Sequence, residues 1–397
     1  MTEKRKTHIK FSDLEKQYDK MKSKYEGYIS VQDVTNIVEK SGMPEDIVEA
    51  TIEDQERTAK SKADLLELLA KNRPKEIDSV EQVTANEIDE EFFQKRFMDI
   101  NTLSAGKKKI LIIADVKGWA WWNKSRYIQY YLSDEFAIDV ICSHGAEATD
   151  VDVNKYDCYL TYGVNYRHLL KGVPADRQIC GMTAHRKKSV TKQLNGVSHL
   201  HANSKMLMSE LTNSIRKSKF YYLPNGVDSE LFVPVKPIGD EKRLRAGHVG
   251  KICDAKGQVD IILPAIEKAN CVRHNNFSDY TNRIPYCKMT DFYQDLDVFL
   301  VASTEDGTPN GALEAASCGR PIISNHIGNM PEFIRDGYNG FLVDPEPEAY
   351  AERLKYLSDH RDILKTMGRN ARIVVDRWWT WRRQAENYRE MFKDIIK

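Results

Sequence analysis

One nineteen-residue segment, Ser303 to Pro321 (STEDGTPNGALEAASCGRP), constrains the fold of this chain more than any other. It continues a short apolar run, VFLVAS, which is typical of a buried parallel strand. Gly, Pro and Asn then indicate a turn, and GALEAASCG predicts a helix that ends near Gly319. The first N–H groups of such a helix face the turn with its positive dipole end. The segment therefore predicts a βα unit with a site suited to a diphosphate.

Two carboxylates accompany this turn. Asp306 lies in the turn, and Glu314 follows eight residues later, about two helical turns deeper. Carboxylates so placed accept hydrogen bonds from hydroxyl groups, which suggests a polyol bound next to a phosphate. The alternative is a surface turn that carries two solvated acids.

The line DGTPNGALEAASCGRPII resembles the donor-binding segment of the GT-B retaining glycosyltransferases of family 4, also called glycosyl transferases group 1. Those proteins carry two Glu residues separated by seven others, in a line similar to EGFPNxxLEAMACGxPVI. Asp306 replaces the first Glu, and Glu314 keeps the second. The resemblance covers about residues 107–397 and is stronger in the second half. It implies two Rossmann-like α/β domains that face each other across a cleft.

Composition sets broad limits. The 397 residues are enough for two to three domains. Basic and acidic residues number 59 each, so net charge favours neither a nucleic-acid nor a membrane partner. Seven scattered cysteines without a Cys-x-x-Cys pair argue against a disulfide framework or zinc site and favour a reducing cytosol. No signal peptide and no apolar run of about eighteen residues is present, so we expect a cytoplasmic protein or one peripheral at a membrane surface.

Changes in pattern divide the chain. Residues 1–105, with 17 basic and 23 acidic side chains, predict a helical extension for oligomerisation or partner binding that donor hydrolysis does not need. A helix-turn-helix is the weaker alternative there, because its second helix would be acidic. We expect an acceptor-side domain at 106–235 and a donor domain at 243–375, joined by a Pro/Gly-rich linker. A terminal helix at 376–397 is expected to cross back to the first domain, as the family resemblance implies.

Glycines and one histidine mark the strand ends. KKKILIIADV predicts a buried strand, with Gly118 in the turn that follows it and a helix after that. His185 stands just past the strand predicted in RQICGMTAH. The resemblance implies that His185 faces the donor sugar, whereas a lone histidine after a strand is more often structural. The line PNGVD predicts a tight turn with positive φ at Asn225 and Gly226.

A second basic cluster follows the linker. RLRAGHVGKICDAKGQ resembles the family line that ends in Lys-Gly, with Gly250 in its turn, Lys256 in place and Lys251 where Arg is usual. The resemblance implies that Lys251 and Lys256 hold the diphosphate of the donor. Two solvated lysines are the alternative.

The resemblance also implies the remaining roles. Gly307, Thr308, Pro309 and Asn310 would shape the turn whose amides face phosphate and sugar. Asp306 would bind sugar hydroxyls and Glu314 the ribose hydroxyls. The expected donor is a nucleotide sugar, UDP-linked by default. The expected reaction retains anomeric configuration and needs no metal, cofactor or covalent nucleophile.

The acceptor is less constrained. Trp121, Trp122, Lys124 and Arg126 could stack on sugars or bases and bind phosphates, and core packing is the alternative. An envelope glycan or lipid is the default acceptor, and a nucleic acid, as modified bases of phage DNA, is the minority alternative. Two other classes remain open: a non-catalytic sugar-nucleotide-binding module, and a GT-B epimerase or phosphorylase.

Overall fold

A computed structural model describes residues 85–97, 106–143, 152, 154–163, 168–184, 193–250, 253–277 and 283–397. All structural statements below concern these residues. The helices expected before residue 85 lie outside the described residues, as do His185 and Lys251.

The first domain contains a six-stranded parallel sheet in the order β2-β1-β3-β4-β5-β6. Its strands are β1 (Lys108–Ala114), β2 (Phe136–Cys142), β3 (Cys158–Thr161), β4 (Gln178–Met182), β5 (His199–Ala202) and β6 (Lys219–Tyr222). The helices around it are α6 (Ala120–Tyr131) and α8 (Lys205–Ser214), with a short 3₁₀ turn η4 (Ala175–Arg177). The apolar run of β1 is buried from Ile110 onward, as expected for a strand covered on both faces.

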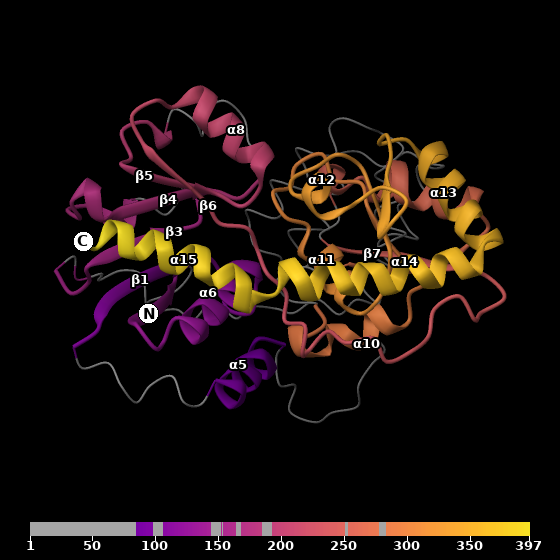
Figure 1. Cartoon of the computed structure of the whole chain (residues 1–397), viewed down its shortest axis with the longest axis horizontal. Helices are drawn as coiled ribbons and strands as arrows, with labels where there is room; N and C mark the ends of the chain where they lie inside the picture. The colour runs from indigo at the N-terminus through magenta and orange to yellow at the C-terminus, as the bar shows by residue number, and fades with distance from the viewer. Residues whose placement is uncertain are drawn as a thin grey trace, which may run out of the picture.

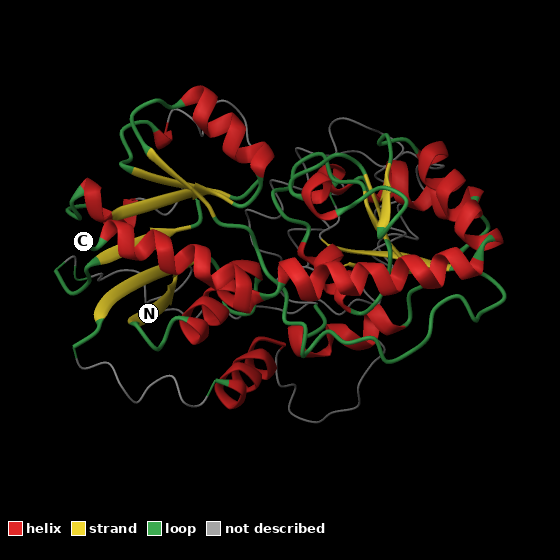
Figure 2. Cartoon of the chain, in the orientation of Figure 1, coloured by secondary structure: helices red, strands yellow, loops and turns green. Residues whose placement is uncertain are grey.

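The second domain contains a five-stranded parallel sheet in the order β11-β10-β9-β7-β8. The strands are β7 (Arg245–Gly250), β8 (Val272–Phe277), β9 (Val298–Val301), β10 (Ile322–Ser324) and β11 (Gly340–Leu342). Its helices are α9 (Leu263–Lys268), α10 (Met289–Gln294), α11 (Asn310–Ser317), α12 (Met330–Phe333), α13 (Pro347–Asp359) and α14 (Arg361–Val374). Shorter helical turns are η5 (Asp254–Lys256), η6 (Gln258–Ile262), η7 (Tyr286–Lys288) and η8 (Val375–Trp379). Two separate lobes, each with its own parallel sheet, are visible in Figure 2, which confirms the predicted fold.

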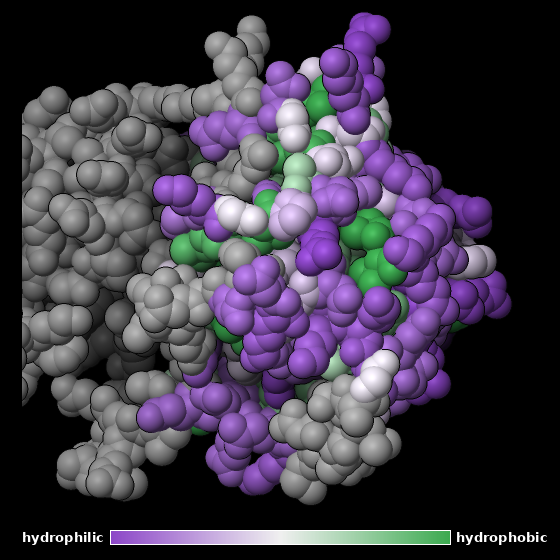
Figure 3. Space-filling model, turned by 90° about the vertical axis from the view of Figure 1, so that its left-hand side faces the viewer, coloured by the Kyte–Doolittle hydropathy of each residue, from purple (hydrophilic) through white to green (hydrophobic). Residues whose placement is uncertain are grey.

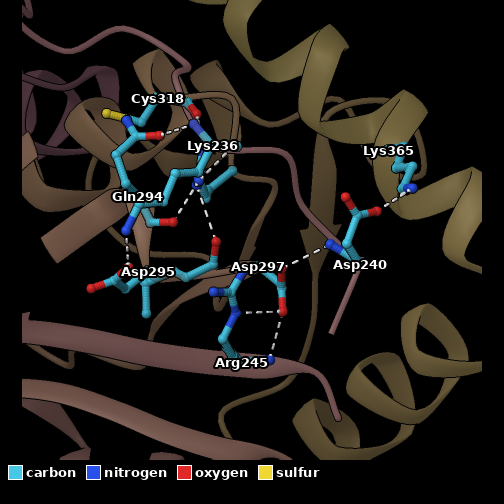
Figure 4. Close-up of polar contacts among 11 residues, drawn as sticks. Lys236, Asp240, Arg245, Gln294, Asp295, Asp297, Cys318 and Lys365 are labelled. Atoms are coloured by element: carbon cyan, nitrogen blue, oxygen red, sulfur yellow. Dashed lines mark hydrogen bonds and ion pairs between the residues drawn. The ribbon is translucent and has the colours of Figure 1, made fainter. Parts of the chain in front are cut away.

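The linker between the domains is fastened to the second one (Figure 4). Gln294 Oε1 accepts hydrogen bonds from the backbone N–H groups of Val235 (3.0 Å) and Lys236 (2.9 Å). The fully buried carboxylate of Asp297 accepts from Gly239 N at 2.8 Å and pairs with Arg245 at 3.0 Å. The Pro/Gly-rich segment therefore has a defined path along the second domain.

The last helix, α15 (Trp381–Ile395), lies along the first domain, and the C-terminus ends beside that sheet (Figure 1). Its buried face includes Tyr388 and Phe392, and Arg389 pairs with Glu135 at 2.9 Å. Before it, Val227 forms a parallel bridge with Thr380. Val227 lies in the segment 223–232, between β6 and the linker, which we call the hinge. Helix α14 and α15 thus run from the second domain onto the first.

One further helix, α5 (Ala85–Arg96), comes from the stretch assigned to the extension. It lies below the junction of the two domains in Figure 1, near α6 and α10. Its side chains pack on both domains, as detailed below, so we treat α5 as part of the two-domain body.

The outer end of the first domain is mostly hydrophilic. In Figure 3 hydrophobic residues on this face form small separate groups among hydrophilic ones. Across the described residues, no helix is both long enough and apolar enough to span a bilayer.

Candidate functional site

The site lies where two topological switch points face each other. In each sheet the strand order reverses beside the first strand, between β1 and β3 and between β7 and β9. Ligands of open α/β sheets bind outside the carboxyl ends of strands at such points. The loop after β1, the end of β7 and the start of α11 meet at a cavity of about 240 Å³ between the domains. Gly118, Gly250 and Asn310 line it, one from each of these three places.

Gly118 and Gly250 place backbone without a side chain at the cavity surface. Gly118 has φ of 76° and Gly250 has φ of 155°, both in a region that L side chains rarely adopt. Backbone can therefore approach a ligand closely on both sides. The structure places both predicted donor-binding glycines at this cavity.

The predicted donor turn also touches the first domain. A Cβ on Gly307 would lie 2.1 Å from the carbonyl oxygen of Thr183. Thr308 Oγ1 donates to the carbonyl of Asn203 at 3.4 Å. Pro309 follows directly and precedes Asn310, the first residue of α11. The turn therefore packs against the residues that follow β4 and β5. One of them, Thr183, precedes His185 by two positions in the sequence.

A hydrogen-bonded chain joins the domains at the start of α11. Lys124 Nζ donates to Asn225 Oδ1, and Asn225 Nδ2 donates to Asn310 Oδ1, both at 2.8 Å. Lys124 is only 2% exposed and its ammonium lies over the rings of Tyr162 (4.6 Å) and Tyr388 (5.5 Å). Burial lowers its pKa to about 7. No carboxylate of the described residues forms an ion pair with Lys124, which lines the cavity.

Glu314 lies one turn into α11 and also lines the cavity. Its carboxylate accepts a hydrogen bond of 2.6 Å from the hydroxyl of the buried Tyr293. Burial raises the pKa of Glu314 to about 7, and the Tyr293 hydrogen bond lowers it in part. The predicted polyol-binding carboxylate is therefore at the cavity, with a partner that orients it.

Asp306 and Lys256 pair with each other. The Nζ–Oδ2 distance is 2.6 Å, and the two side chains are mostly buried. Burial lowers the pKa of Lys256, but the adjacent Asp306 charge outweighs it and the net pKa is raised. We expected these two residues to bind different parts of the ligand, whereas the structure pairs them with each other beside the donor turn. A ligand phosphate or hydroxyl would bind next to this ion pair or replace one partner.

The residues expected to face an acceptor do not all lie at the cavity. Trp122 is 6% exposed and packs edge-on against Phe93 at 5.2 Å, with Arg126 over its ring at 5.7 Å. This favours the core-packing alternative for Trp122. Trp121 is partly buried against Tyr162, with 5.7 Å between ring centroids.

The prediction of positive φ at Asn225 and Gly226 is wrong, because neither residue has positive φ. A Cβ on Gly226 would lie 2.6 Å from the backbone nitrogen and Cα of Trp381, so glycine is required by a close approach of α15. Asn225 serves as the bridge between Lys124 and Asn310.

Several residues that line the cavity were not predicted from the sequence. Among them are Tyr293, Arg283 and Tyr286. They lie in a segment without a recognisable motif, so their roles come only from the tertiary contacts. The described residues contain no group of three or more His, Cys, Asp or Glu side chains placed to hold a metal ion. None of the seven cysteines, all in described residues, forms a disulfide.

Comparisons with known proteins agree with this geometry. Residues 257–360 match the family model described as glycosyl transferases group 1. An uncharacterized glycosyltransferase of Methanocaldococcus jannaschii is 24% identical over 48% of this chain and 58% of its own length. A D-inositol 3-phosphate glycosyltransferase of Paenarthrobacter aurescens is 23% identical over 53% of this chain and 62% of its own. The chain thus spans less than two thirds of these relatives.

Solved structures show the same architecture. A sucrose-phosphate synthase from Thermosynechococcus elongatus superposes with a TM-score of 0.62, at 15% identity, over 73% of this chain and 99% of its own. Anabaena HepE in complex with UDP-glucose gives a TM-score of 0.55, at 15% identity, over 72% and 99%. At these identities the likeness establishes the fold: the chain has the GT-B arrangement of two Rossmann-like domains.

Proposed function

We propose that this protein is a glycosyltransferase that binds a nucleotide sugar in the cavity between its domains and transfers the sugar to an acceptor. The observation that carries the proposal is the convergence of Gly118, Gly250, the start of α11, Lys124 and Glu314 on one cavity. The group 1 match over residues 257–360 and the glycosyltransferase relatives support it. The HepE complex supports a UDP-linked donor.

Different residues at the cavity would bind the successive parts of a nucleotide sugar. The N-terminus of α11 offers backbone N–H groups and a positive dipole end to the diphosphate. Lys124 supplies a cation from the opposite domain. Glu314, deeper along α11, accepts hydrogen bonds from ribose hydroxyls. Charge that develops on the departing diphosphate is thereby met by groups already in place, which is a large term in catalysis.

The remaining roles follow from the family resemblance. His185 would contact the donor sugar, Lys251 and Lys256 would assist the diphosphate, and Asp306 would bind sugar hydroxyls. Retention is proposed to occur on the front face. The acceptor oxygen bonds to the anomeric carbon as the bond from that carbon to the phosphate oxygen breaks, and the leaving phosphate takes the acceptor's proton. No metal is assigned to this step.

An envelope glycan or lipid is the proposed acceptor class, and nucleic acid is the second. Trp121 and Arg126, of the first domain, are the residues proposed to face it. We propose a cytoplasmic location for the reaction.

A thermal-shift screen of UDP, GDP, ADP and their sugar conjugates tests the donor site. One nucleoside diphosphate at millimolar concentration is expected to raise Tm, since a ligand that binds only the native state stabilises it. No shift with any of the three would remove the donor-site assignment. Release of free sugar from the matching conjugate then separates an enzyme from a non-catalytic module. Release of an epimer or of a sugar phosphate would instead support the epimerase or phosphorylase alternatives.

A further inference from the structure

Helix α5 packs on both domains through one aromatic side chain. The Phe93 ring is fully buried and meets Trp122 (5.2 Å) and Tyr127 (5.5 Å) of α6 edge-on. The same ring stacks on Tyr286 of η7 at 5.9 Å. A helix outside both sheets therefore contributes to the contact between them.

The C-terminal end of α5 is tied to the segment that joins the domains. Arg96 pairs with Asp228 at 2.9 Å, next to the bridge-forming Val227. Asp228 also accepts a hydrogen bond of 2.8 Å from the hydroxyl of Tyr127. This second attachment fixes the helix against the hinge.

The third attachment reaches the cavity wall. Asp89 of α5 is fully buried, and its Oδ2 pairs with Arg283 Nη2 at 2.6 Å. Its Oδ1 accepts from the backbone N–H of Cys287 at 3.3 Å. The Arg283 side chain is 8% exposed and lines the cavity. A buried guanidinium needs such a partner, because a buried charge left alone is costly.

The position of Arg283 identifies what it would meet. A nucleotide is a linear series of phosphate, ribose and base. With the diphosphate proposed at the start of α11 and the ribose at Glu314, the second-domain lining residues left for the base include Arg283, Ile284 and Tyr286. A planar guanidinium can stack on a base or donate to it.

We propose, on the basis of the proposed function, that α5 is part of the donor site: Asp89 positions Arg283 to contact the nucleobase. Arg283 is then a base-binding residue contributed by the second domain, and Asp89 is a positioning residue that acts through it. The phosphate end of the cavity does not depend on this pair.

The test uses the full chain and isothermal titration with UDP, GDP and ADP, their parent nucleosides, and inorganic pyrophosphate. Asp89→Asn and Arg283→Gln are each expected to weaken the nucleoside and nucleoside diphosphate that bind the wild type about tenfold, and to leave pyrophosphate affinity unchanged. The double variant is expected to bind no more weakly than Arg283→Gln alone. Glu91→Gln is the matched control, since this exposed residue of the same helix forms its ion pair with Lys95, at 2.6 Å, and not with a residue of the cavity.

Arg283→Lys provides a second variant should Asp89→Asn not fold, since it keeps the charge opposite Asp89 but loses the planar group. It is expected to show the same selective loss of base affinity. Wild-type nucleoside affinity in these variants would overturn the proposal, and additive losses in the double variant would show that Asp89 does not act through Arg283. If the wild type binds a nucleoside diphosphate and the variants bind it equally well, this inference fails alone. If the wild type binds none of the three nucleoside diphosphates, the proposed function fails as well.

Discussion

Lys124 combines features that favour a bound anion. Its ammonium is buried, opens to the cavity and donates to a neutral amide, Asn225. Taking a charge out of water is costly unless it is paired, and here the pairing comes from an amide oxygen and two aromatic rings. A phosphate in the cavity would supply the missing negative charge.

Lys124→Met is therefore expected to weaken binding of a nucleoside diphosphate by about 1.5–3 kcal/mol, the range for hydrogen bonds to charged groups, or roughly ten- to one-hundred-fold. The parent nucleoside lacks the phosphates and should bind as it does to the wild type. Isothermal titration measures both. Lys171→Met, on an exposed lysine of the same domain, is the control. Equal losses for nucleoside and nucleotide would place Lys124 away from the phosphates.

Glu314 predicts a pH dependence. Its pKa of about 7 in the free protein means that the carboxylate becomes fully ionised only as the pH rises above neutrality. The ionised form is the better acceptor for ribose hydroxyls, so nucleoside affinity should increase from pH 6 to pH 8. Glu314→Gln should remove this rise. A nucleoside is the right probe, because Lys124, with a pKa also about 7, would lose its charge over the same range and oppose the trend for a phosphate ligand.

At the residue scale, the sequence analysis selected Gly118, Gly250, Asn310 and Glu314 as donor-binding residues, and all four line the cavity. Their roles toward a ligand stay predictions. Their partners could not be predicted. The Tyr293–Glu314 bond joins residues 21 positions apart, and the Asn225–Asn310 bond joins residues 85 apart. Nothing in either sequence neighbourhood encodes such pairings. The first arises when the second domain folds, and the second when the two domains dock.

At the scale of elements, the donor turn is a contact between domains as well as a ligand loop. Backbone of the first domain lies where a Gly307 side chain would be, and backbone cannot move aside as a flexible side chain can. The turn can hold its place only if residue 307 has no Cβ.

Gly307→Ala should therefore separate the turn from β4 and β5. Overpacking of this kind costs about 1–3 kcal/mol of folding free energy. We also expect at least a tenfold loss of sugar release from the donor, because the two halves of the site no longer meet. Urea unfolding and donor hydrolysis measure the two effects. Thr304→Ala, an exposed position of the same loop, should change neither. Full activity in Gly307→Ala would mean that the Gly307–Thr183 contact is not part of the active arrangement.

Helices and strands were predicted correctly where the signal was a short apolar run or a cluster of turn-forming residues. Apolar runs gave β1 and β9, and the Gly/Pro/Asn turn gave the start of α11. Helix α5 was not anticipated as part of the folded core. Its sequence is polar apart from Phe92, Phe93 and a few others, and the burial of Phe93 and Asp89 depends on surfaces from two other domains.

At the scale of the molecule, the resemblance predicted two facing domains and a terminal helix that returns to the first, but not the contact made by α5. Besides the donor turn, three segments of the described residues connect the domains. The hinge and linker run from the first domain to the second, α15 returns to the first domain, and α5 packs on both. Residues 1–105 were assigned to a separate extension from their acidic charge and helical periodicity. Neither property reveals where a helix docks, so the packing of α5 was not predicted.

The docking of α5 argues against one expectation from the sequence. We expected donor hydrolysis to need none of residues 1–105. A protein shortened to begin at Ser104 loses Phe93 and Phe97, two buried aromatics whose truncation typically costs about 3–5 kcal/mol each, and leaves Arg283 without Asp89. It should be less stable toward urea and should bind nucleosides more weakly. A protein that begins at residue 80 keeps α5 and should behave as the full chain does in both measurements. Should the Ser104 form match it in stability and nucleoside affinity, α5 would be a passive attachment and the donor site would consist of the two domains alone.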